Sequence, residues 1–196
     1  YEDFTKRLAD LQLGNFMVAV ALYGHDQRVH DMITRVDGSF EQTCKGIKNL
    51  LKYNIPVEIR TIISKLNYKH LSQIAEFVSK EFSNIQRFVF VNMKYTGNAF
   101  LNKEKVFIKI SDVIPFVLGA VKILKSNTIP TRLYHFPLCL LPENFREIAK
   151  GVTKAELEEL TFVEACKECK VRNECPRIWK TYIGIAGEGE FKAIKG

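Results

Sequence analysis

The chain has 196 residues, of which 46% are hydrophobic and 11% aromatic, so it can bury the core of one substantial domain. No apolar run approaches the roughly 18 residues that cross a bilayer, and charged residues at the start exclude a secretory signal peptide. We therefore expect a soluble cytoplasmic protein that has no membrane partner.

The formal net charge is +7, which would suit an anionic partner, but the positive charges are spread along the chain. The basic segments at 103–112 and 167–180 also contain acidic residues, and no arginine-rich run or aromatic RNA-binding pattern is present. A solvated basic surface is the favoured interpretation, and nucleic-acid binding is the weaker alternative.

Residues 1–14 are typical of the tail of a helix that ends at Gly14. Because the chain begins at a tyrosine rather than a methionine, we expect further residues upstream. The run at 16–23 is continuously apolar, which is typical of a strand buried on both faces.

Three amphipathic helices follow, separated by apolar strands. Ser39 and Gln42 predict a capping box at the start of the first helix, and Ser111 or Asp112 would cap the third. In chain order the predictions are a helix at 38–53, a strand at 57–63, a helix at 69–82, a strand at 87–93, a helix at 111–126 and a strand at 131–136.

This alternation predicts βαβ units and an α/β fold with a parallel sheet. In such folds, ligands bind at the carboxyl ends of the strands. Those ends are the polar or glycine-containing segments 22–26, 63–67 and 91–99, which suit a binding site but are also ordinary connecting loops.

The alternation stops after residue 136, so we divide the chain into residues 1–136 and a small extension at 137–196. The extension begins with a segment typical of short helices over irregular backbone. Its tail at 182–196 is rich in glycine, which favours a turn with a short strand.

The extension holds four of the five cysteines, and their number and spacing favour a metal centre. An odd count in a chain without a secretion signal argues against a disulfide framework. Cys166, Cys169 and Cys175 follow the spacing C-x2-C-x5-C, and Cys139 is the natural fourth ligand. Cys44 lies on the apolar face of a predicted helix, where a buried thiol is expected.

Four thiolates suit either Zn²⁺ or an iron–sulfur cluster. A zinc ribbon usually pairs two C-x2-C units, whereas this chain joins one such unit to a third cysteine and a distant fourth. That asymmetry favours a [4Fe–4S] cluster. Three unliganded cysteines in one loop would be an oxidation liability, which makes that alternative the weakest.

Several motifs resemble the second half of a radical SAM barrel. They are a Leu-x-Gly turn at 22–24, the pair His30-Asp31, a Gly-Ser-Phe helix start at 38–40 and the valine-rich strand at 57–63. The cysteine segment and the tail are similar to the SPASM or twitch extension of radical SAM peptide maturases. With the segment that begins at Leu133, they resemble most closely the His-Xaa-Ser system maturases, over about residues 14–194.

The resemblance implies the C-terminal part of a partial (β/α)6 barrel that binds S-adenosylmethionine at the carboxyl ends of its strands. In the family, a reduced [4Fe–4S] cluster cleaves S-adenosylmethionine, and the resulting radical abstracts a hydrogen atom from the substrate. The implied partners are a peptide substrate and, as a second candidate, a partner maturase.

The chain also departs from the family pattern. The C-x3-C-x2-C motif of the radical-generating cluster and the Gly-Gly-Glu-Pro motif are absent and would lie upstream of Tyr1, so the chain alone should not cleave S-adenosylmethionine. Ala21 replaces a serine that contacts the ribose. Pro176-Arg177 follows the last cysteine, and the usual Gly-Gly pair is missing.

By position, the resemblance assigns Arg60 to the cofactor carboxylate or a barrel carboxylate, and Asn92 and Met93 to backbone contacts with the adenine. An ion pair of Arg60 with Glu58 is the structural alternative. Asn67 is either a helix cap or a ligand.

The favoured reading is therefore the C-terminal portion of a radical SAM peptide-modifying oxidoreductase, with an auxiliary [4Fe–4S] cluster on Cys139, Cys166, Cys169 and Cys175. The alternative from another class is a non-catalytic zinc module that docks peptides. The reaction and the modified residue do not follow from these residues.

Overall fold

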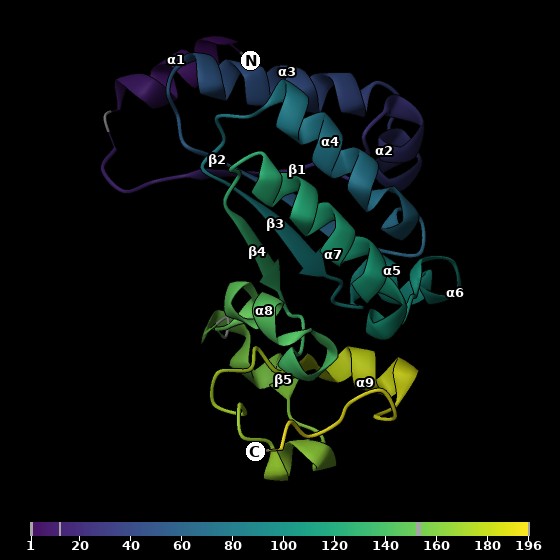
Figure 1. The fold of residues 1–196 in the computed structure, drawn as a ribbon. Helices are drawn as coiled ribbons and strands as arrows, with labels where there is room; N and C mark the ends of the chain where they lie inside the picture. Colours follow the sequence, from purple (N-terminus) through teal and green to yellow (C-terminus); the bar gives the residue numbers. More distant parts are fainter. Residues whose placement is uncertain (1, 12, 152–153, 196) are drawn as a thin grey trace.

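The computed structural model describes residues 2–11, 13–151 and 154–195. At its centre lies a four-stranded parallel sheet, which confirms the predicted α/β class (Figure 1). The strands follow one another in chain order: β1 at Val18–Ala21, β2 at Val57–Ile63, β3 at Arg87–Asn92 and β4 at Thr131–Tyr134.

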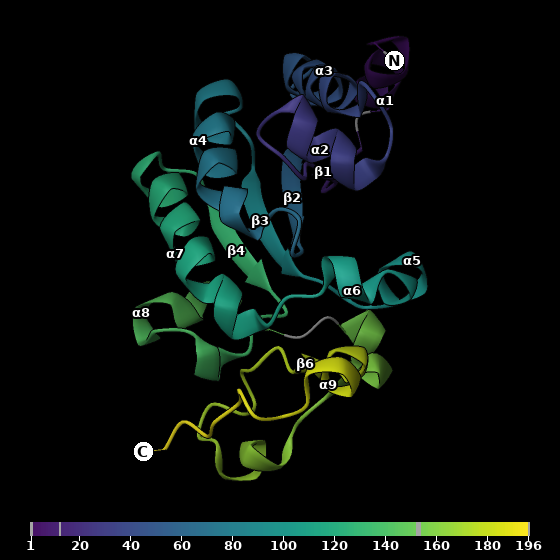
Figure 2. The same ribbon diagram turned by 90° about the vertical axis from the view of Figure 1, so that its right-hand side faces the viewer.

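Three long helices cover one face of this sheet (Figure 2). They are α3 at Ser39–Lys52, α4 at Leu71–Glu81 and α7 at Ile110–Ser126, all close to their predicted ranges. Ile59 and Ile63 of β2 point toward these helices and are buried in one core with Ile74 and Val117. Cys44 is half-buried and packs against this core, as expected.

Four shorter helices complete this part of the chain. Helix α1 at Glu2–Asp10 packs against α3, α2 at Gln27–Thr34 follows β1, and α5 at Gly97–Leu101 and α6 at Lys103–Val106 follow β3. The prediction missed α2, which begins where the Asp26 carboxylate accepts a hydrogen bond from the Val29 N–H at 2.8 Å. No helix in the described ranges is long and apolar enough to cross a bilayer.

Both predicted caps are wrong, because groups distant along the chain satisfy the helix starts. Gly38 precedes α3, and the Asp31 carboxylate accepts from the Phe40 N–H at 2.8 Å and from the Ser39 hydroxyl at 2.7 Å. At the start of α7, the Tyr182 hydroxyl accepts from the Ile110 N–H at 2.9 Å, and Glu190 accepts from the Ser111 N–H at 2.9 Å.

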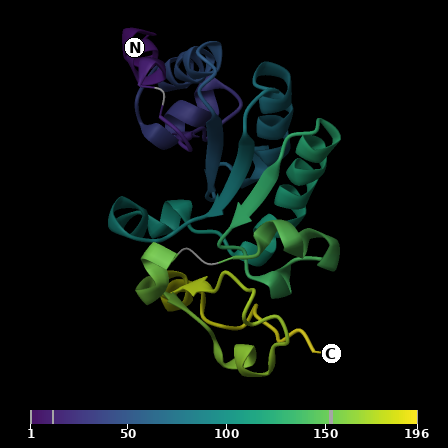
Figure 3. The ribbon, with the colours of Figure 1, turned by 90° about the vertical axis from the view of Figure 1, so that its left-hand side faces the viewer.

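The second face of the sheet is open along β1 and β2 in the part of the chain that the structure describes (Figure 3). Ala19, Ala21 and Arg60 lie on this face and are exposed. Because side chains alternate along a strand, the face also receives Glu58 and Ile62. Arg60 therefore lies on the side of the sheet opposite to the helical core.

The extension lies beyond the carboxyl ends of β3 and β4 (Figure 1). Its strands β5 at Leu160–Thr161 and β6 at Ile178–Trp179 pair antiparallel. The tail begins with helix α9 at Lys180–Ala186, where a turn with a short strand was predicted. That prediction was wrong because Tyr182 is fully buried among aromatic side chains and bonds to α7, contacts that the local sequence does not reveal.

The remaining elements of the extension are short. They are the single turns η2 at Leu138–Leu140 and η3 at Glu147–Ala149, helix α8 at Glu143–Arg146, and the turns η4 at Lys154–Glu159 and η5 at Glu164–Glu168.

Candidate functional site

A cavity of about 410 Å³ opens at the carboxyl ends of β2, β3 and β4. All three residues predicted to contact the cofactor line it, although they come from two different strands. The lining residues are Arg60, Ile62, Val91, Asn92, Met93, Lys94, Ala99, Tyr134, His135 and Trp179. A cavity of this volume, with apolar walls and a few polar groups, is typical of a small-molecule site.

Arg60 enters the cavity from the open face of the sheet. Its Nε–H donates to Glu58, which is completely buried and also accepts from the Nε–H of Arg87. The predicted ion pair with Glu58 is therefore present. It uses one of the five N–H donors of Arg60, whose side chain is 44% exposed, and the other four have no hydrogen-bond partner among the described residues.

Two arginines share one carboxylate in this cluster, so its net charge is positive at neutral pH. The Arg60 guanidinium also lies over the Tyr134 ring, with 5.9 Å between its central carbon and the ring centroid. A positive group held between a buried carboxylate and an aromatic ring is well placed to bind a carboxylate or phosphate.

Asn92 and Met93 lie where β3 ends. Asn92 is buried and pairs in register with Ile63, and Met93 is half-buried against the core. Their positions at the end of a parallel strand explain how both reach the same cavity as Arg60.

Aromatic residues that the sequence analysis missed form the far wall of the cavity. The rings of His135 and Trp179 lie 4.1 Å apart, and the Lys94 ammonium lies 5.1 Å from the centroid of the Trp179 ring. The backbone of His135 adopts a left-handed conformation, with φ at 63°. Trp179 is the only tryptophan of the chain and directly follows the cysteine segment, a signal that could have drawn attention to it.

Asn67 has a structural role in the neighbouring loops. Its side-chain oxygen accepts from the Ser64 N–H at 2.8 Å, and its amide donates to the carbonyls of Ile62 at 3.1 Å and Tyr23 at 3.2 Å. The residue is fully buried and makes no side-chain cap. It therefore ties two βα loops together. Asn67 also stands at the N-cap position of the turn η1 at Tyr68–His70, although its side chain makes no capping bond there, and its role as a ligand stays a prediction.

His30 and Asp31 organise the loop after β1. His30 Nδ1 accepts from the Tyr23 N–H at 3.1 Å, and burial lowers the pKa of its imidazole. Gly24 packs against α2, and a Cβ atom added to Gly24 would lie 2.5 Å from the backbone nitrogen of His30. His30 and Asp31 thus fix the shape of the loop, His30 through the Tyr23 N–H and Asp31 through the Gly38 N–H.

The four cysteines of the extension line one hollow, although they span residues 139 to 175. Cys139 comes from η2 and Cys166 from η5, while Cys169 and Cys175 lie in the irregular segment between η5 and β6. The rest of the hollow is apolar except for three cations. The other lining residues are Pro137, Leu138, Phe162, Val171, Arg172, Arg177, Ile178 and Lys192.

Burial and backbone hydrogen bonds act in opposite directions on these thiols. Burial raises the pKa of the Cys139 thiol to about 11, while a backbone hydrogen bond from Lys192 lowers it. Burial also raises the pKa of Cys175, opposed by backbone hydrogen bonds from Leu138 and Arg177. The backbone hydrogen bonds thus favour the thiolate form, which binds metals, and burial opposes it.

The four thiols that line the hollow are the donor type that a thiolate-binding metal centre uses. Within the described ranges, no three His, Cys, Asp or Glu side chains are close enough to hold a single metal ion. On ligand type alone, four thiolates suit either Zn²⁺ or an iron–sulfur cluster.

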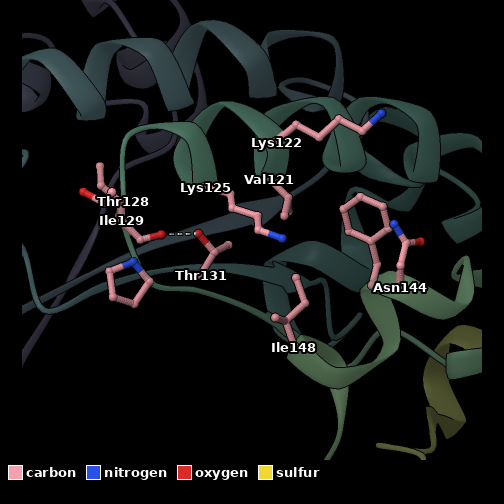
Figure 4. A pocket seen from close by; sticks show the side chains of 10 residues that line it. Val121, Lys122, Lys125, Thr128, Ile129, Thr131, Asn144 and Ile148 are labelled. Atoms are coloured by element: carbon pink, nitrogen blue, oxygen red, sulfur yellow. Dashed lines mark hydrogen bonds between the residues drawn. The ribbon is translucent and has the colours of Figure 1, made fainter.

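A separate cavity of about 510 Å³ lies at the other end of the sheet, where β4 begins (Figure 4). It is formed by the C-terminal half of α7, the start of β4, and the segment that contains α8 and η3. None of the residues predicted to form the site lines it.

Comparison with known proteins gives weak likenesses. No family model matches the chain, and no curated protein matches it. Among solved structures, it is similar to a domain of pyruvate-formate lyase-activating enzyme from Bacteroides vulgatus, with 16% identity over 68% of this chain and 74% of that one and a TM-score of 0.48. A radical SAM methyltransferase from Sphaerobacter thermophilus gives 12% identity, 68% and 37% coverage and a TM-score of 0.45. Both TM-scores lie below 0.5.

Proposed function

We propose that the chain is the C-terminal part of a cytoplasmic radical SAM enzyme that modifies a peptide. The observation that carries this proposal is that four cysteines line one hollow directly beside the cavity at the carboxyl ends of the parallel strands. The two spaces share a wall made of β6, since Ile178 lines the hollow and Trp179 lines the cavity.

In this proposal, Arg60 binds the carboxylate of S-adenosylmethionine with the N–H groups that Glu58 leaves free. The backbone at Asn92 and Met93 contacts the adenine. Tyr134 and Trp179 supply aromatic surface to the same ligand. When bound, S-adenosylmethionine would supply the radical chemistry together with the family's radical-generating cluster, whose C-x3-C-x2-C motif is not among these residues. The residues named here would bind and orient the ligand and exclude water.

Cys139, Cys166, Cys169 and Cys175 hold a [4Fe–4S] cluster in the hollow. Their thiols must lose protons to bind iron. Arg172, Arg177 and Lys192, which line the same hollow, offset the negative charge of four thiolates. Full ligation by four cysteines suits a structural or electron-transfer cluster, and the substrate peptide would approach through the cavity on the other side of β6.

Anaerobic reconstitution of the chain tests this proposal. We expect about four irons and four sulfides per chain, with broad visible absorption. Cys139→Ala should lose most of the iron, whereas Cys44→Ala, which removes a thiol from the helical core, should retain it. Uptake of one zinc in preference to iron would instead support a non-catalytic zinc module.

Binding of S-adenosylmethionine to the reconstituted chain tests the second half of the proposal. Arg60→Ala should weaken binding at least tenfold. Arg87→Ala is the matched control, because Arg87 bonds to the same Glu58 but does not line the cavity. Equal losses in the two variants would show that only the integrity of the ion cluster matters.

A further inference from the structure

Arg177 occupies a backbone position that suits glycine. Its φ angle is 68°, in the left-handed region that a residue with a Cβ atom rarely adopts. It directly follows Pro176 and precedes β6, so the turn fixes where its side chain goes. This backbone conformation is unfavourable for arginine, and the side chain that it positions lines the four-cysteine hollow.

The Arg177 side chain reaches the four-cysteine hollow. Its guanidinium carbon lies 5.0 Å from the centroid of the Phe162 ring, and that of Arg172 lies 4.5 Å from the same centroid. All three residues line the hollow. The aromatic ring therefore holds two positive groups beside the sulfur atoms.

The guanidinium of Arg177 has an unused donor at this place. Its Nε–H is buried and has no hydrogen-bond partner among the described residues, and neither Arg177 nor Arg172 forms an ion pair there. A buried N–H group without an acceptor is unfavourable. Thiolate or sulfide sulfur is the acceptor that the hollow would provide.

We propose that Arg177 is a positioning residue that directs positive charge and an Nε–H donor at the metal centre held by the four cysteines. The inference rests on the proposed function. Reduction adds an electron to a centre that is already anionic, so a nearby cation and an N–H donor stabilise the reduced form. The guanidinium should therefore raise the reduction potential of the cluster.

The test compares Arg177→Gly with Arg35→Gly in the reconstituted chain. Arg35 is a matched control because it is also an arginine in the left-handed region, with φ at 60°, at the end of α2 and outside the hollow. Glycine should relieve the backbone in both variants, so neither should unfold at a lower temperature than the wild type.

In a dye-mediated redox titration, Arg177→Gly should lower the ratio of reduced to oxidised cluster about tenfold at a fixed potential, which is about 59 mV for a one-electron couple. Arg35→Gly should match the wild type, and Arg177→Lys should fall between them. Loss of iron from Arg177→Gly alone, in a folded chain, would also support the role.

Two failures can be told apart. If the wild type holds its cluster and Arg177→Gly has the same iron content and potential, this inference is wrong and the proposed function survives. If the wild type takes up no cluster, both are wrong.

The cavity at the start of β4 carries a second inference, independent of the first. Five of its lining residues are apolar and five are polar or charged. The apolar ones are Val121, Ile129, Pro130, Phe145 and Ile148, and the others are Lys122, Lys125, Thr128, Thr131 and Asn144. Figure 4 shows the Lys125 ammonium over these apolar side chains, whereas the Lys122 side chain extends away from them. Lys125 has no ion-pair partner in the described ranges.

We infer that this cavity binds a small carboxylate with an apolar body. The apolar walls would bury the body, and the Lys125 ammonium would pair with the carboxylate. The ion pair alone would give little affinity, because Lys125 is exposed and water competes for its ammonium group. We therefore expect tight binding only when the apolar body is buried as well.

Calorimetric titration of the chain with octanoate, 1-octanol and acetate separates the two contributions. Octanoate should bind at least tenfold more tightly than either of the others. Lys125→Glu should weaken octanoate binding at least tenfold, whereas Lys80→Glu, the same change at an exposed lysine of α4, should not. Equal binding of octanol and octanoate, or no effect of Lys125→Glu, would overturn the inference.

Discussion

Ile178 and Trp179 are consecutive residues of β6, yet their side chains line two different spaces. Ile178 contributes to the wall of the four-cysteine hollow, and Trp179 to the wall of the cavity at the strand ends. Both residues are 3% exposed. Because side chains alternate along a strand, β6 forms part of the wall of both spaces. A substitution at Ile178 or Trp179 should therefore alter the shape of both.

Trp179→Ala should lower the free energy of unfolding by about 3–5 kcal/mol, because it leaves a cavity beside His135 and removes the ring under Lys94. Denaturant unfolding measures this loss. Phe100→Ala is the control, since that aromatic side chain is 47% exposed and its truncation should change stability by less than about 0.5 kcal/mol. Equal losses of unfolding free energy in the two variants would mean that Trp179 does not stabilise the wall of the cavity.

Glu58→Gln should lower the free energy of unfolding by about 3 kcal/mol, since it leaves Arg60 and Arg87 without a counter-charge at a completely buried position. We expect the low end of the usual range because both guanidinium groups are partly exposed. Glu76→Gln, at an exposed position of α4, should be nearly neutral. A neutral result at both sites would show that the ion cluster contributes nothing to folding.

Glu190→Gln should weaken the connection between the tail and α7. Glu190 accepts from the Ser111 N–H and from the Tyr182 hydroxyl at the helix start, so losing its charge should cost about 1 kcal/mol. Glu188→Gln is the control on the same tail, where the carboxylate accepts a long hydrogen bond of 3.3 Å from the Glu164 N–H. Thermal unfolding distinguishes the two, and a larger loss in Glu188→Gln would contradict the capping role.

Stability should fall with pH below about 6.5. Burial lowers the pKa of His30 from 6.5, opposed by the neighbouring Asp31, so the unfolded chain binds this proton more readily than the folded chain. The stabilising effect is therefore complete above 6.5 and is lost as the pH falls through the folded-state pKa. Protonation would also remove the acceptor for the Tyr23 N–H.

The check is the free energy of unfolding of wild type and His30→Asn at pH 7.5 and pH 5.5. The variant should show a smaller difference between the two values. Burial lowers the pKa of His70 as well, so part of the pH dependence should remain in His30→Asn. That remaining part should be lost when His70→Asn is added to His30→Asn. A pH dependence that His30→Asn leaves unchanged would rule out this residue as a source.

The sheet and its three covering helices could be predicted because their signals are local. Hydrophobic periodicity and β-branched runs depend on neighbours a few residues apart, as in Ile59 and Ile63. Cys139 was chosen for its place in the extension and for ligand count, and it lines one hollow with the other three cysteines; that it binds a metal stays a prediction.

The errors concern contacts between distant residues. Glu190 reaches the start of α7 from 79 residues away, so the capping signal near Ser111 was misleading. The helix at Lys180–Ala186 depends on the burial of Tyr182 against residues of other elements. Trp179 was missed for the same reason, because its two neighbours in the cavity wall, His135 and Lys94, come from other parts of the chain.

The central claim is that four sulfurs from residues 139 to 175 hold one iron–sulfur cluster beside the strand ends. Anomalous diffraction from crystals of the reconstituted chain, collected on both sides of the iron absorption edge, tests it most directly. The account predicts one compact iron peak bounded by the sulfurs of Cys139, Cys166, Cys169 and Cys175, on the Ile178 side of β6. A zinc signal at that place, or iron density that excludes Cys139, would contradict it.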